Sequence, residues 1–282
     1  MFQRTAGKLR GKGLGKIPLV QPIYKKLNTL LSIGGRYKII NITSFGTKLK
    51  VDLRDTGDLT PTLLSKGIYD PTMSRMVDML SVDGTCIDIG ANIGYFTTIM
   101  AKKARKVYAY EPLDSNFHLL EENLRLNDTT NSIPILKAIS NKDGTEKLVI
   151  TEGHIGSNYL TQDEYKNTIL VDVSKLDTVH KGEIIDLIKV DVQGYEGKIL
   201  EGMEDLVKVN KDIDMIWAYL PKALLRAGTV PLEFLNRLGK LGTLIDLDEK
   251  ENNIVELTPE KFLDKYGMTR HTNILVVKRS IN

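Results

Sequence analysis

The sequence predicts an α/β fold, in which a mainly parallel, seven-stranded sheet carries helices on both faces. Three observations support this prediction. From residue 85 onward, short apolar runs typical of strands alternate with segments of helical periodicity. Residues 184–190 are interpreted as an apolar strand of the kind that is buried on both faces of a parallel sheet. The chain has 282 residues, 41% hydrophobic and 27% charged, which is enough to bury one large core.

The region before residue 82 is mixed. Residues 37–53 carry β-branched side chains on either side of a Ser44-Phe45-Gly46 turn, a pattern that predicts a β-hairpin. Asp70 followed by Pro71 predicts the start of a helix, with Asp70 as the N-cap and Pro71 at the first helical position. Apolar residues then recur at helical spacing, so this helix should have one buried face.

The alternating region supplies the predicted sheet. Strands are predicted at 85–89, 106–110, 133–139, 184–190, 215–219, 243–247 and 274–277, with helices at 93–103, 115–126 and 231–241 and a further helix after 190. Residues 143–173 interrupt the alternation with two strand-like runs around a polar stretch, which we interpret as an insertion or lid. Ligands of such folds bind beyond the carboxyl ends of the strands, so the chemistry is expected near residues 89, 110 and 190.

The first polar turn is Asp88-Ile89-Gly90-Ala91-Asn92-Ile93-Gly94, which follows a strand and opens a helix. The glycines permit a sharp turn and a close ligand, and Asp88 is an acceptor suited to an ammonium or hydroxyl group. Asn92 stands where the dinucleotide fingerprint has its second glycine, which lets a pyrophosphate approach the backbone. The turn therefore favours S-adenosylmethionine, which has no pyrophosphate, over NAD. A plain strand-to-helix turn is the alternative.

The second polar turn is Glu111-Pro112, at the end of the second predicted strand. An acid about 20 residues beyond the glycine turn can accept hydrogen bonds from both ribose hydroxyls of a nucleoside cofactor. NAD and S-adenosylmethionine both carry that ribose, so Glu111 alone does not distinguish them. A surface carboxylate is the alternative interpretation.

The third polar turn follows the apolar strand, within Lys189-Val190-Asp191-Val192-Gln193-Gly194-Tyr195-Glu196. Charges where a buried strand ends are seldom there for packing. Asp191 is the first candidate for a general base, or for a group that orients the methyl-bearing end of the cofactor. Glu196 is the second candidate, although an acid in a first helical turn also stabilises the helix.

Together these motifs resemble the FkbM family of S-adenosylmethionine-dependent methyltransferases, from about residue 83 to 219. The resemblance rests on residues 88–95, Tyr110-Glu111-Pro112, Asn123, Asn127, Leu176-Asp177 and residues 188–196. It implies a Rossmann-like class I methyltransferase fold, with Asp88, Gly90, Asn92 and Gly94 on the methionine part of the cofactor and Glu111 on its ribose. It also implies O-methylation of a hydroxyl on a sugar, a glycan or a small natural product.

The chain departs from the family pattern at two places. The family usually has Glu at the position of Gln193, and an acid in the strand where this chain has Trp217-Ala218-Tyr219. A non-catalytic relative that binds S-adenosylmethionine is therefore one alternative, and an NAD-dependent oxidoreductase is another. We expect residues 1–81 to form a basic tail, hairpin and helix that cover the substrate side of an S-adenosylmethionine-binding domain at 82–282.

Composition narrows the classes of partner. A net charge of +3 is too small to indicate a nucleic-acid binder. Residues 1–16 are basic and contain no acid, so they are expected to be either a frayed terminus or a weak contact with an anionic membrane surface. No apolar run approaches the roughly 18 residues that span a bilayer, and the N-terminus lacks a signal-peptide core. We interpret the protein as cytoplasmic, with peripheral membrane contact through the tail as the alternative.

Cysteine and histidine add little chemistry. Cys86 is the single cysteine, so no intrachain disulfide can form, and its place in a strand predicts a small buried residue. The four histidines lack the spacing of a zinc site, and no metal is expected. His154, in the expected lid, is the one histidine that could face a substrate.

Overall fold

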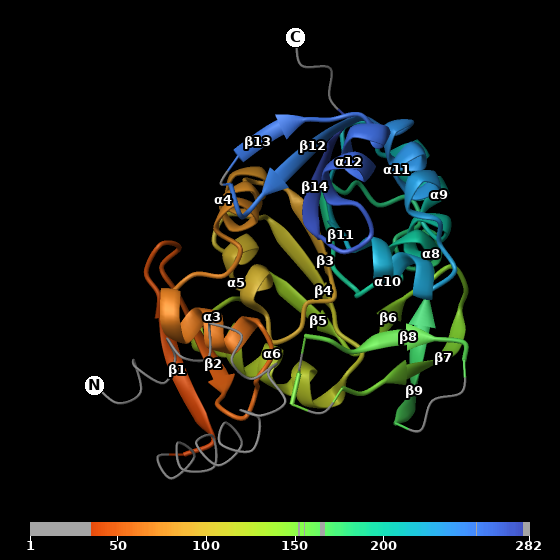
Figure 1. Cartoon of the computed structure of the whole chain (residues 1–282). Helices are drawn as coiled ribbons and strands as arrows, with labels where there is room; N and C mark the ends of the chain where they lie inside the picture. Colours follow the sequence, from red (N-terminus) through yellow and green to blue (C-terminus); the bar gives the residue numbers. More distant parts are fainter. Residues whose placement is uncertain (1–34, 152, 155, 164–166, 252, 279–282) are drawn as a thin grey trace, which may run out of the picture.

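The computed structural model describes residues 35–151, 153–154, 156–163, 167–251 and 253–278. The basic tail at 1–16 lies outside these residues. The centre of the molecule is an eight-stranded sheet in the order β13-β12-β14-β11-β10-β3-β4-β5 (Figure 1). Its strands are β3 (Thr85–Ile89), β4 (Lys106–Tyr110), β5 (Ser132–Ile135), β10 (Leu187–Val190), β11 (Asp214–Tyr219), β12 (Thr243–Asp248), β13 (Asn253–Glu256) and β14 (Thr272–Val277).

The strand directions confirm the predicted mainly parallel α/β sheet. β5, β4, β3, β10 and β11 are joined by parallel pairings, and β14 runs antiparallel between β11 and β12. The expected count of seven strands is one too few for the described residues, because β13 pairs with β12 at the edge. β13 carries no buried residue, so it lacks the apolar alternation that predicts a strand.

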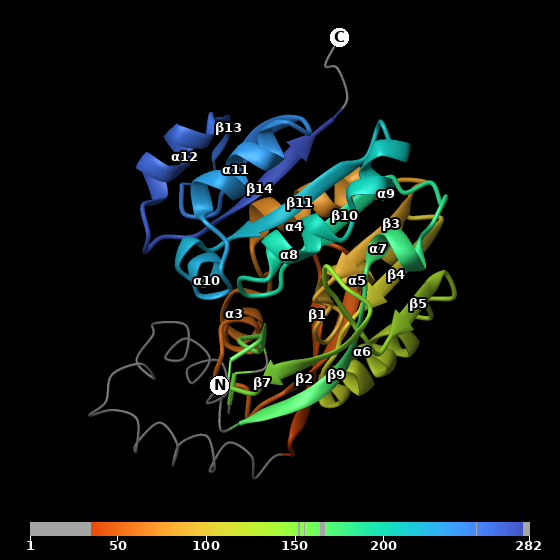
Figure 2. The same ribbon diagram turned by 90° about the vertical axis from the view of Figure 1, so that its right-hand side faces the viewer.

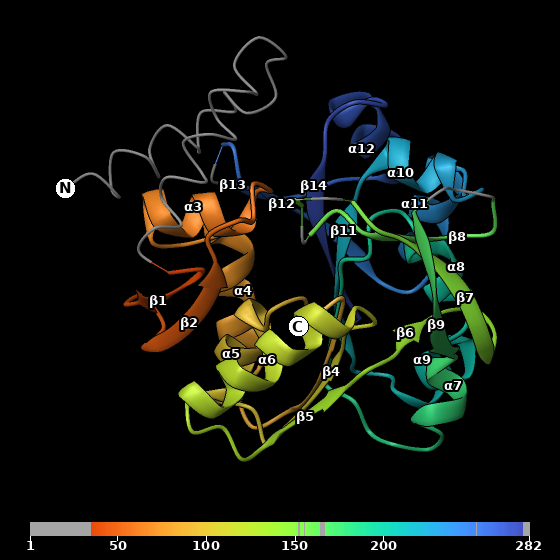
Figure 3. The ribbon, with the colours of Figure 1, turned by 90° about the horizontal axis from the view of Figure 1, so that it is seen from below.

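Helices cover both faces of the sheet, as Figure 3 shows. One face packs against α3 (Leu59–Lys66), α4 (Pro71–Leu80), α5 (Tyr95–Ala101) and α6 (Asp114–Leu126). The other face packs against α7 (Leu176–Val179), α8 (Glu196–Glu201), α9 (Glu204–Val209), α10 (Pro221–Arg226), α11 (Pro231–Gly239) and α12 (Pro259–Tyr266). Within the described ranges, no helix is both long enough and apolar enough to cross a membrane.

The predicted insertion forms a second sheet of four strands, in the order β6-β9-β7-β8. Its strands are β6 (Ala138–Ile139), β7 (Gly144–Val149), β8 (Tyr159–Thr161) and β9 (Thr168–Ser174). Figure 2 shows β7 and β9 set apart from the strands of the main sheet. The prediction of one strand at 133–139 is wrong. The chain leaves the main sheet after β5 and enters the second sheet at β6, and both segments are extended and apolar enough to look continuous in sequence.

The predicted hairpin is present as β1 (Tyr37–Ile42) and β2 (Thr47–Asp52), which pair antiparallel. Asn123 of α6 and Asn127, the C-cap residue of that helix, bind the backbone of β2. Asn127 accepts from Lys48 N and donates to Lys48 O, both at 2.7 Å. Asn123 accepts from Lys50 N at 2.6 Å and donates to Lys50 O at 3.1 Å. The two asparagines are four residues apart at the end of the helix, and the two lysines are two residues apart on the strand. The spacings agree, so the four hydrogen bonds join the hairpin to α6.

The predicted helix start at Asp70-Pro71 is correct, because α4 begins at Pro71. Asp70 also occupies the predicted N-cap position, but its side chain does not act as the cap. Asp70 adopts a left-handed backbone conformation with φ 38°, and its side chain makes no capping hydrogen bond. Instead, the Glu249 carboxylate accepts from Thr72 N at 2.9 Å and from Met73 N at 2.6 Å. An acid distant in sequence therefore supplies the cap.

Candidate functional site

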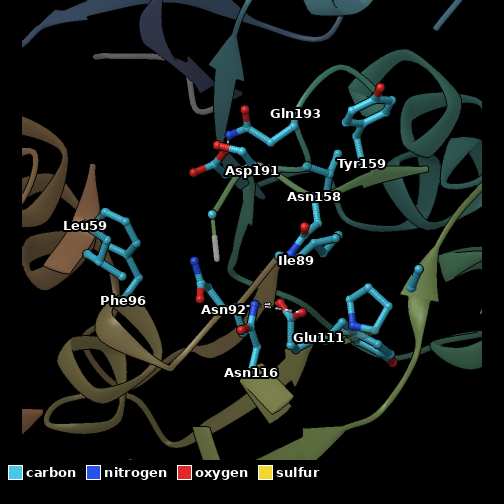
Figure 4. Close-up of a pocket in the computed structure, with 18 of the residues that line it drawn as sticks. Leu59, Ile89, Asn92, Phe96, Glu111, Asn116, Asn158, Tyr159, Asp191 and Gln193 are labelled. Atoms are coloured by element: carbon cyan, nitrogen blue, oxygen red, sulfur yellow. Dashed lines mark hydrogen bonds between the residues drawn. The ribbon is translucent and has the colours of Figure 1, made fainter. Parts of the chain in front are cut away.

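A cavity of about 1100 Å³, including its open mouth, lies at the carboxyl ends of β3, β4 and β10. We call it the first cavity. Residues 89–92, 110–112 and 191–193 line it, as do residues 156–160 of the insertion (Figure 4). The cavity therefore lies where the sequence predicted the chemistry. Of the predicted site residues, it is lined by Gly90, Ala91, Asn92, Glu111, Pro112 and Asp191. Asp88, Gly94 and Glu196 are not among its lining residues.

Gly90 lets two strand ends approach each other. Its φ is +76°, and a Cβ at this position would lie 2.0 Å from the carbonyl oxygen of Asp191. Any other residue would therefore push the turn after β3 away from the turn after β10. Gly94 has a different role, since a Cβ there would lie 2.7 Å from Leu120 Cδ1 of α6. Gly94 permits helix packing beside the site.

Asn92 presents an acceptor at the cavity. Its backbone is left-handed, with φ 53°, and its N–H donates to Glu111 Oε2 at 2.8 Å (Figure 4). The side-chain oxygen Oδ1 is buried and has no hydrogen-bond partner among the described residues. Buried polar atoms normally have partners, so this oxygen suits a donor on a ligand.

Glu111 joins the turns after β3 and β4. Only 6% of its surface is exposed, and its Oε1 accepts from Leu113 N at 3.0 Å. Burial raises the pKa of the Glu111 carboxyl to about 7, while the hydrogen bonds from Leu113 and Asn92 act in the opposite direction. The carboxylate lines the cavity and is an acceptor for ligand hydroxyls.

Asp88 is fully buried and does not contact the first cavity. Its Oδ1 accepts from Lys189 Nζ at 2.8 Å, and its Oδ2 accepts from Thr97 Oγ1 at 2.7 Å. Lys189 does line the cavity, and its Nζ lies 3.3 Å from the carbonyl oxygen of Gly90. Burial opposes the charge of Lys189, but the carboxylates of Asp88 and Asp191 raise its pKa. The ion pair between Asp88 and Lys189 therefore stabilises the turn that begins at Gly90.

Asp191 and Glu196 are separated by the fold. Asp191 lines the cavity, and its Oδ1 accepts from Gln193 Nε2 at 3.2 Å. Glu196 is fully buried, and its Oε1 accepts from Val192 N at 3.1 Å. Burial raises the pKa of the Glu196 carboxyl to about 7. Glu196 thus braces the loop that carries Asp191, while Asp191 itself faces the cavity.

Several lining residues were not predicted from the sequence. They include Asp58, Leu59, Tyr69, Asn158, Tyr159, Lys189 and Gln193. In Figure 4, Leu59 and Tyr159 lie on opposite sides of the labelled group. The insertion contacts the N-terminal region here, since Thr56 N and Oγ1 donate to Gly153 O at 2.7 and 2.8 Å. His154 is not among the lining residues. Lys189 carried a usable signal, because it is a charged residue within an apolar strand.

A family model described as Methyltransferase FkbM domain matches residues 88–220. Methyltransferase sdnD of Sordaria araneosa is 28% identical over 155 residues, which cover 42% of this chain and 60% of that protein. A tRNA(Phe) (4-demethylwyosine(37)-C(7)) aminocarboxypropyltransferase of Methanocaldococcus jannaschii is 34% identical over 108 residues, 36% of this chain and 43% of that protein. Hexuronic acid methyltransferase AglP of Haloferax volcanii is 30% identical over 128 residues, 45% of this chain and 52% of that protein.

The chain thus spans about half the length of these curated relatives. The segment that matches the family model contains the turns after β3, β4 and β10, which build the first cavity. The resemblance found in the sequence is confirmed, and this family assignment supports S-adenosylmethionine as the cofactor. Residues 88–220 of this chain therefore resemble the FkbM methyltransferase domain, in the region where the sequence motifs predicted it.

Proposed function

We propose that this protein is an S-adenosylmethionine-dependent methyltransferase that O-methylates a hydroxyl of a sugar, a glycan or a small natural product. The observation that carries the proposal is the first cavity, which brings the turn at 90–92, the Glu111 carboxylate and Asp191 to one edge of the sheet. The family of residues 88–220 supports methyl transfer. The name of the Haloferax relative, a hexuronic acid methyltransferase, supports a sugar acceptor.

The residues present fit the cofactor. Gly90 lets the turns after β3 and β10 meet at the cavity, and the unpartnered Asn92 Oδ1 is an acceptor for the ammonium of the methionine part. Glu111 would accept from the ribose hydroxyls, in the position that the sequence predicts. Asp88 and Gly94 would support this turn from outside the cavity. When bound, the cofactor supplies a methyl group that its sulfonium already activates.

The protein then has to position the acceptor and remove its proton. Alignment of two reactants alone lowers a barrier by several kcal/mol, and a general base adds about 10²–10⁴-fold. Gln193 holds Asp191 through Oδ1, which leaves Oδ2 to take the proton of the acceptor hydroxyl. We assign Asp191 as the base and Glu196 as support for its loop.

The N-terminal region belongs to the acceptor side in this proposal. Asp58, Leu59 and Tyr69 line the first cavity together with the turn that follows β10. Residues 35–81 would therefore cover the substrate, and the domain that binds S-adenosylmethionine would begin near residue 82.

Calorimetry of the full chain tests the cofactor. We expect S-adenosylmethionine and its demethylated product to bind with Kd on the order of micromolar, and NAD to bind negligibly. Binding of NAD without S-adenosylmethionine would overturn the proposal. Release of the demethylated product is then measured with sugars, sugar acids, natural-product alcohols and tRNA. Cofactor binding without turnover on any acceptor would support the non-catalytic alternative.

Glu111→Ala tests the part that Glu111 plays in the cofactor site. We expect it to weaken S-adenosylmethionine binding by roughly 1–3 kcal/mol, because the ribose hydroxyls lose their acceptor. Glu122→Ala removes a partly exposed carboxylate of α6 that pairs with Lys50, and serves as the control. Equal cofactor affinities in the two variants would remove Glu111 from the cofactor site.

A further inference from the structure

We propose that the methyl acceptor carries an oxyanion, a carboxylate or a phosphate, which Arg226 binds in a second cavity beside the first. This inference rests on the proposed function, because it concerns the acceptor of that reaction. It goes further by naming a chemical class of acceptor and the residue that selects it.

The second cavity adjoins the first. It encloses about 560 Å³ with its open mouth, and it is lined by residues 159–163, Tyr195, Lys198 and residues 226–228. Tyr159 and Leu160 line both cavities, so β8 forms a shared wall. One acceptor molecule can therefore place its reacting hydroxyl near Asp191 and extend another group into the second cavity.

Arg226 is held in place where the two cavities meet. Its guanidinium carbon lies 3.6 Å from the centroid of the Tyr159 ring. Its Nη2 donates to the carbonyl oxygen of Gln193 at 2.7 Å. Gln193 has a left-handed backbone, with φ 61°, and also binds Asp191. The guanidinium is therefore fixed relative to the proposed base, although the residue is exposed.

The guanidinium retains hydrogen-bonding capacity. Arginine has five N–H donors, and the one bond to Gln193 leaves an edge for a ligand. In the part of the chain that the structure describes, no carboxylate forms an ion pair with Arg226. Paired N–H groups of arginine match the two oxygens of a carboxylate or phosphate. A fixed arginine without an acidic partner is suited to an anionic ligand.

Charge distinguishes the two cavities. The first is lined by the carboxylates of Asp58, Glu111 and Asp191. Among its described lining residues the basic side chain is Lys189, which is already paired with Asp88. The second is lined by Arg226 and Lys198, against Asp163 as the one acid among its described lining residues. Lys198 pairs with Glu201 at 3.4 Å, so Arg226 is the stronger candidate. An acceptor with one anionic group would be repelled from the first cavity and oriented with its hydroxyl toward Asp191.

Ligand binding to the protein saturated with S-adenosylhomocysteine tests the proposal without turnover. The ligands are D-glucuronate, D-glucose 6-phosphate and D-glucose, measured by calorimetry or ligand-observed NMR. We expect one or both anionic sugars to bind at least about 10-fold tighter than glucose, with an advantage that falls as salt rises. The preference between the two anions identifies carboxylate or phosphate as the natural group.

Variants of Arg226 distinguish recognition of the anionic group from a purely structural role of this residue. Arg226→Ala should reduce binding of the anionic sugars to the level of glucose and leave glucose itself unchanged. Arg226→Lys should retain part of the preference, since a lysine keeps the charge but not the paired donors. Lys222→Ala is the matched control, because Lys222 is exposed on the same helix and lines neither cavity.

Three results would overturn the proposal. Glucose could bind as tightly as the anionic sugars, none of the three could bind, or Arg226→Ala could weaken all of them equally. The last result would make Arg226 a brace for Gln193 only. Failure of S-adenosylhomocysteine to bind the unmodified protein would instead count against the proposed function, so the two failures are distinguishable.

Discussion

The two halves of the first cavity are built differently. The half that we propose for the cofactor, called the cofactor half, consists of residues 89–92 and 110–112, which follow adjacent parallel strands. Gly90 N and Ala91 N both donate to Tyr110 O at 3.0 Å, so the main sheet itself fixes this half. The half that we propose for the acceptor, called the acceptor half, consists of Asp58, Tyr69, Tyr159, Asp191 and Gln193, which come from separate parts of the chain.

This difference has a consequence for specificity. The cofactor half depends on backbone geometry, which many side-chain changes elsewhere leave intact. The acceptor half depends on side chains from the N-terminal region, the second sheet and the loop after β10, and each can change independently. Fold and cofactor are therefore compatible with many acceptors, as is general for sites carried on common folds.

The largest expected effect comes from displacing the turn after β3, which builds the cofactor half. Gly90→Ala should weaken S-adenosylmethionine binding at least about 100-fold and destabilise the fold by roughly 3 kcal/mol, because its Cβ meets the Asp191 backbone at 2.0 Å. Gly46→Ala is the control, since φ there is +63° with no neighbour within 4 Å. It should cost about 1–2 kcal/mol from backbone strain alone and leave the affinity unchanged. Calorimetry and thermal melts measure both, and equal affinity losses would contradict the close-approach argument.

Asp191→Asn tests the acceptor half. It preserves the shape of the side chain and removes the proton acceptor, so turnover should fall at least about 10²-fold, with cofactor affinity within a few-fold. Steady-state rates and calorimetry on the same preparation measure both quantities. A rate near that of the unmodified protein would leave alignment as the source of catalysis. Loss of cofactor binding would assign Asp191 to the cofactor half.

Glu196→Gln should have the smallest effect on the reaction, because Glu196 faces neither half. Its pKa is raised from 4.5 to about 7 in the fold, so the folded state retains the proton there and stability falls as pH rises from about 4.5 to 7. Glutamine cannot ionise and still accepts from Val192 N. The variant should match the unmodified protein near pH 4.5 and be more stable by about 3 kcal/mol above pH 7. Melting at several pH values checks this, and a constant difference across pH would refute it.

The sequence was most informative where burial was complete. The strands at 85–89 and 106–110 were predicted to the residue, since each is short, apolar and followed by a polar turn. The predicted strand at 184–190 begins only at Leu187, because Ile184 is 59% exposed. The prediction placed the start of the strand too early because Ile184 is apolar but exposed.

The partners of the site residues could not be predicted in the same way. Lys189 meets Asp88 because β10 and β3 pair in parallel with these two residues in register, and no local pattern encodes that register. The link from Arg226 through Gln193 to Asp191 likewise depends on where α10 docks. The sequence predicted the turns that carry chemistry, while the tertiary pairing decided which side chains reach the cavity.

The bonds between α6 and the hairpin have a consequence for association between chains. An uncovered strand edge offers its N–H and C=O groups to a strand of any other molecule, which is a route to aggregation. Asn123 and Asn127 already occupy those groups at Lys50 and Lys48. The two side-chain amides therefore make the hydrogen bonds that a neighbouring strand would make. This part of β2 is not available to pair with a strand of another molecule.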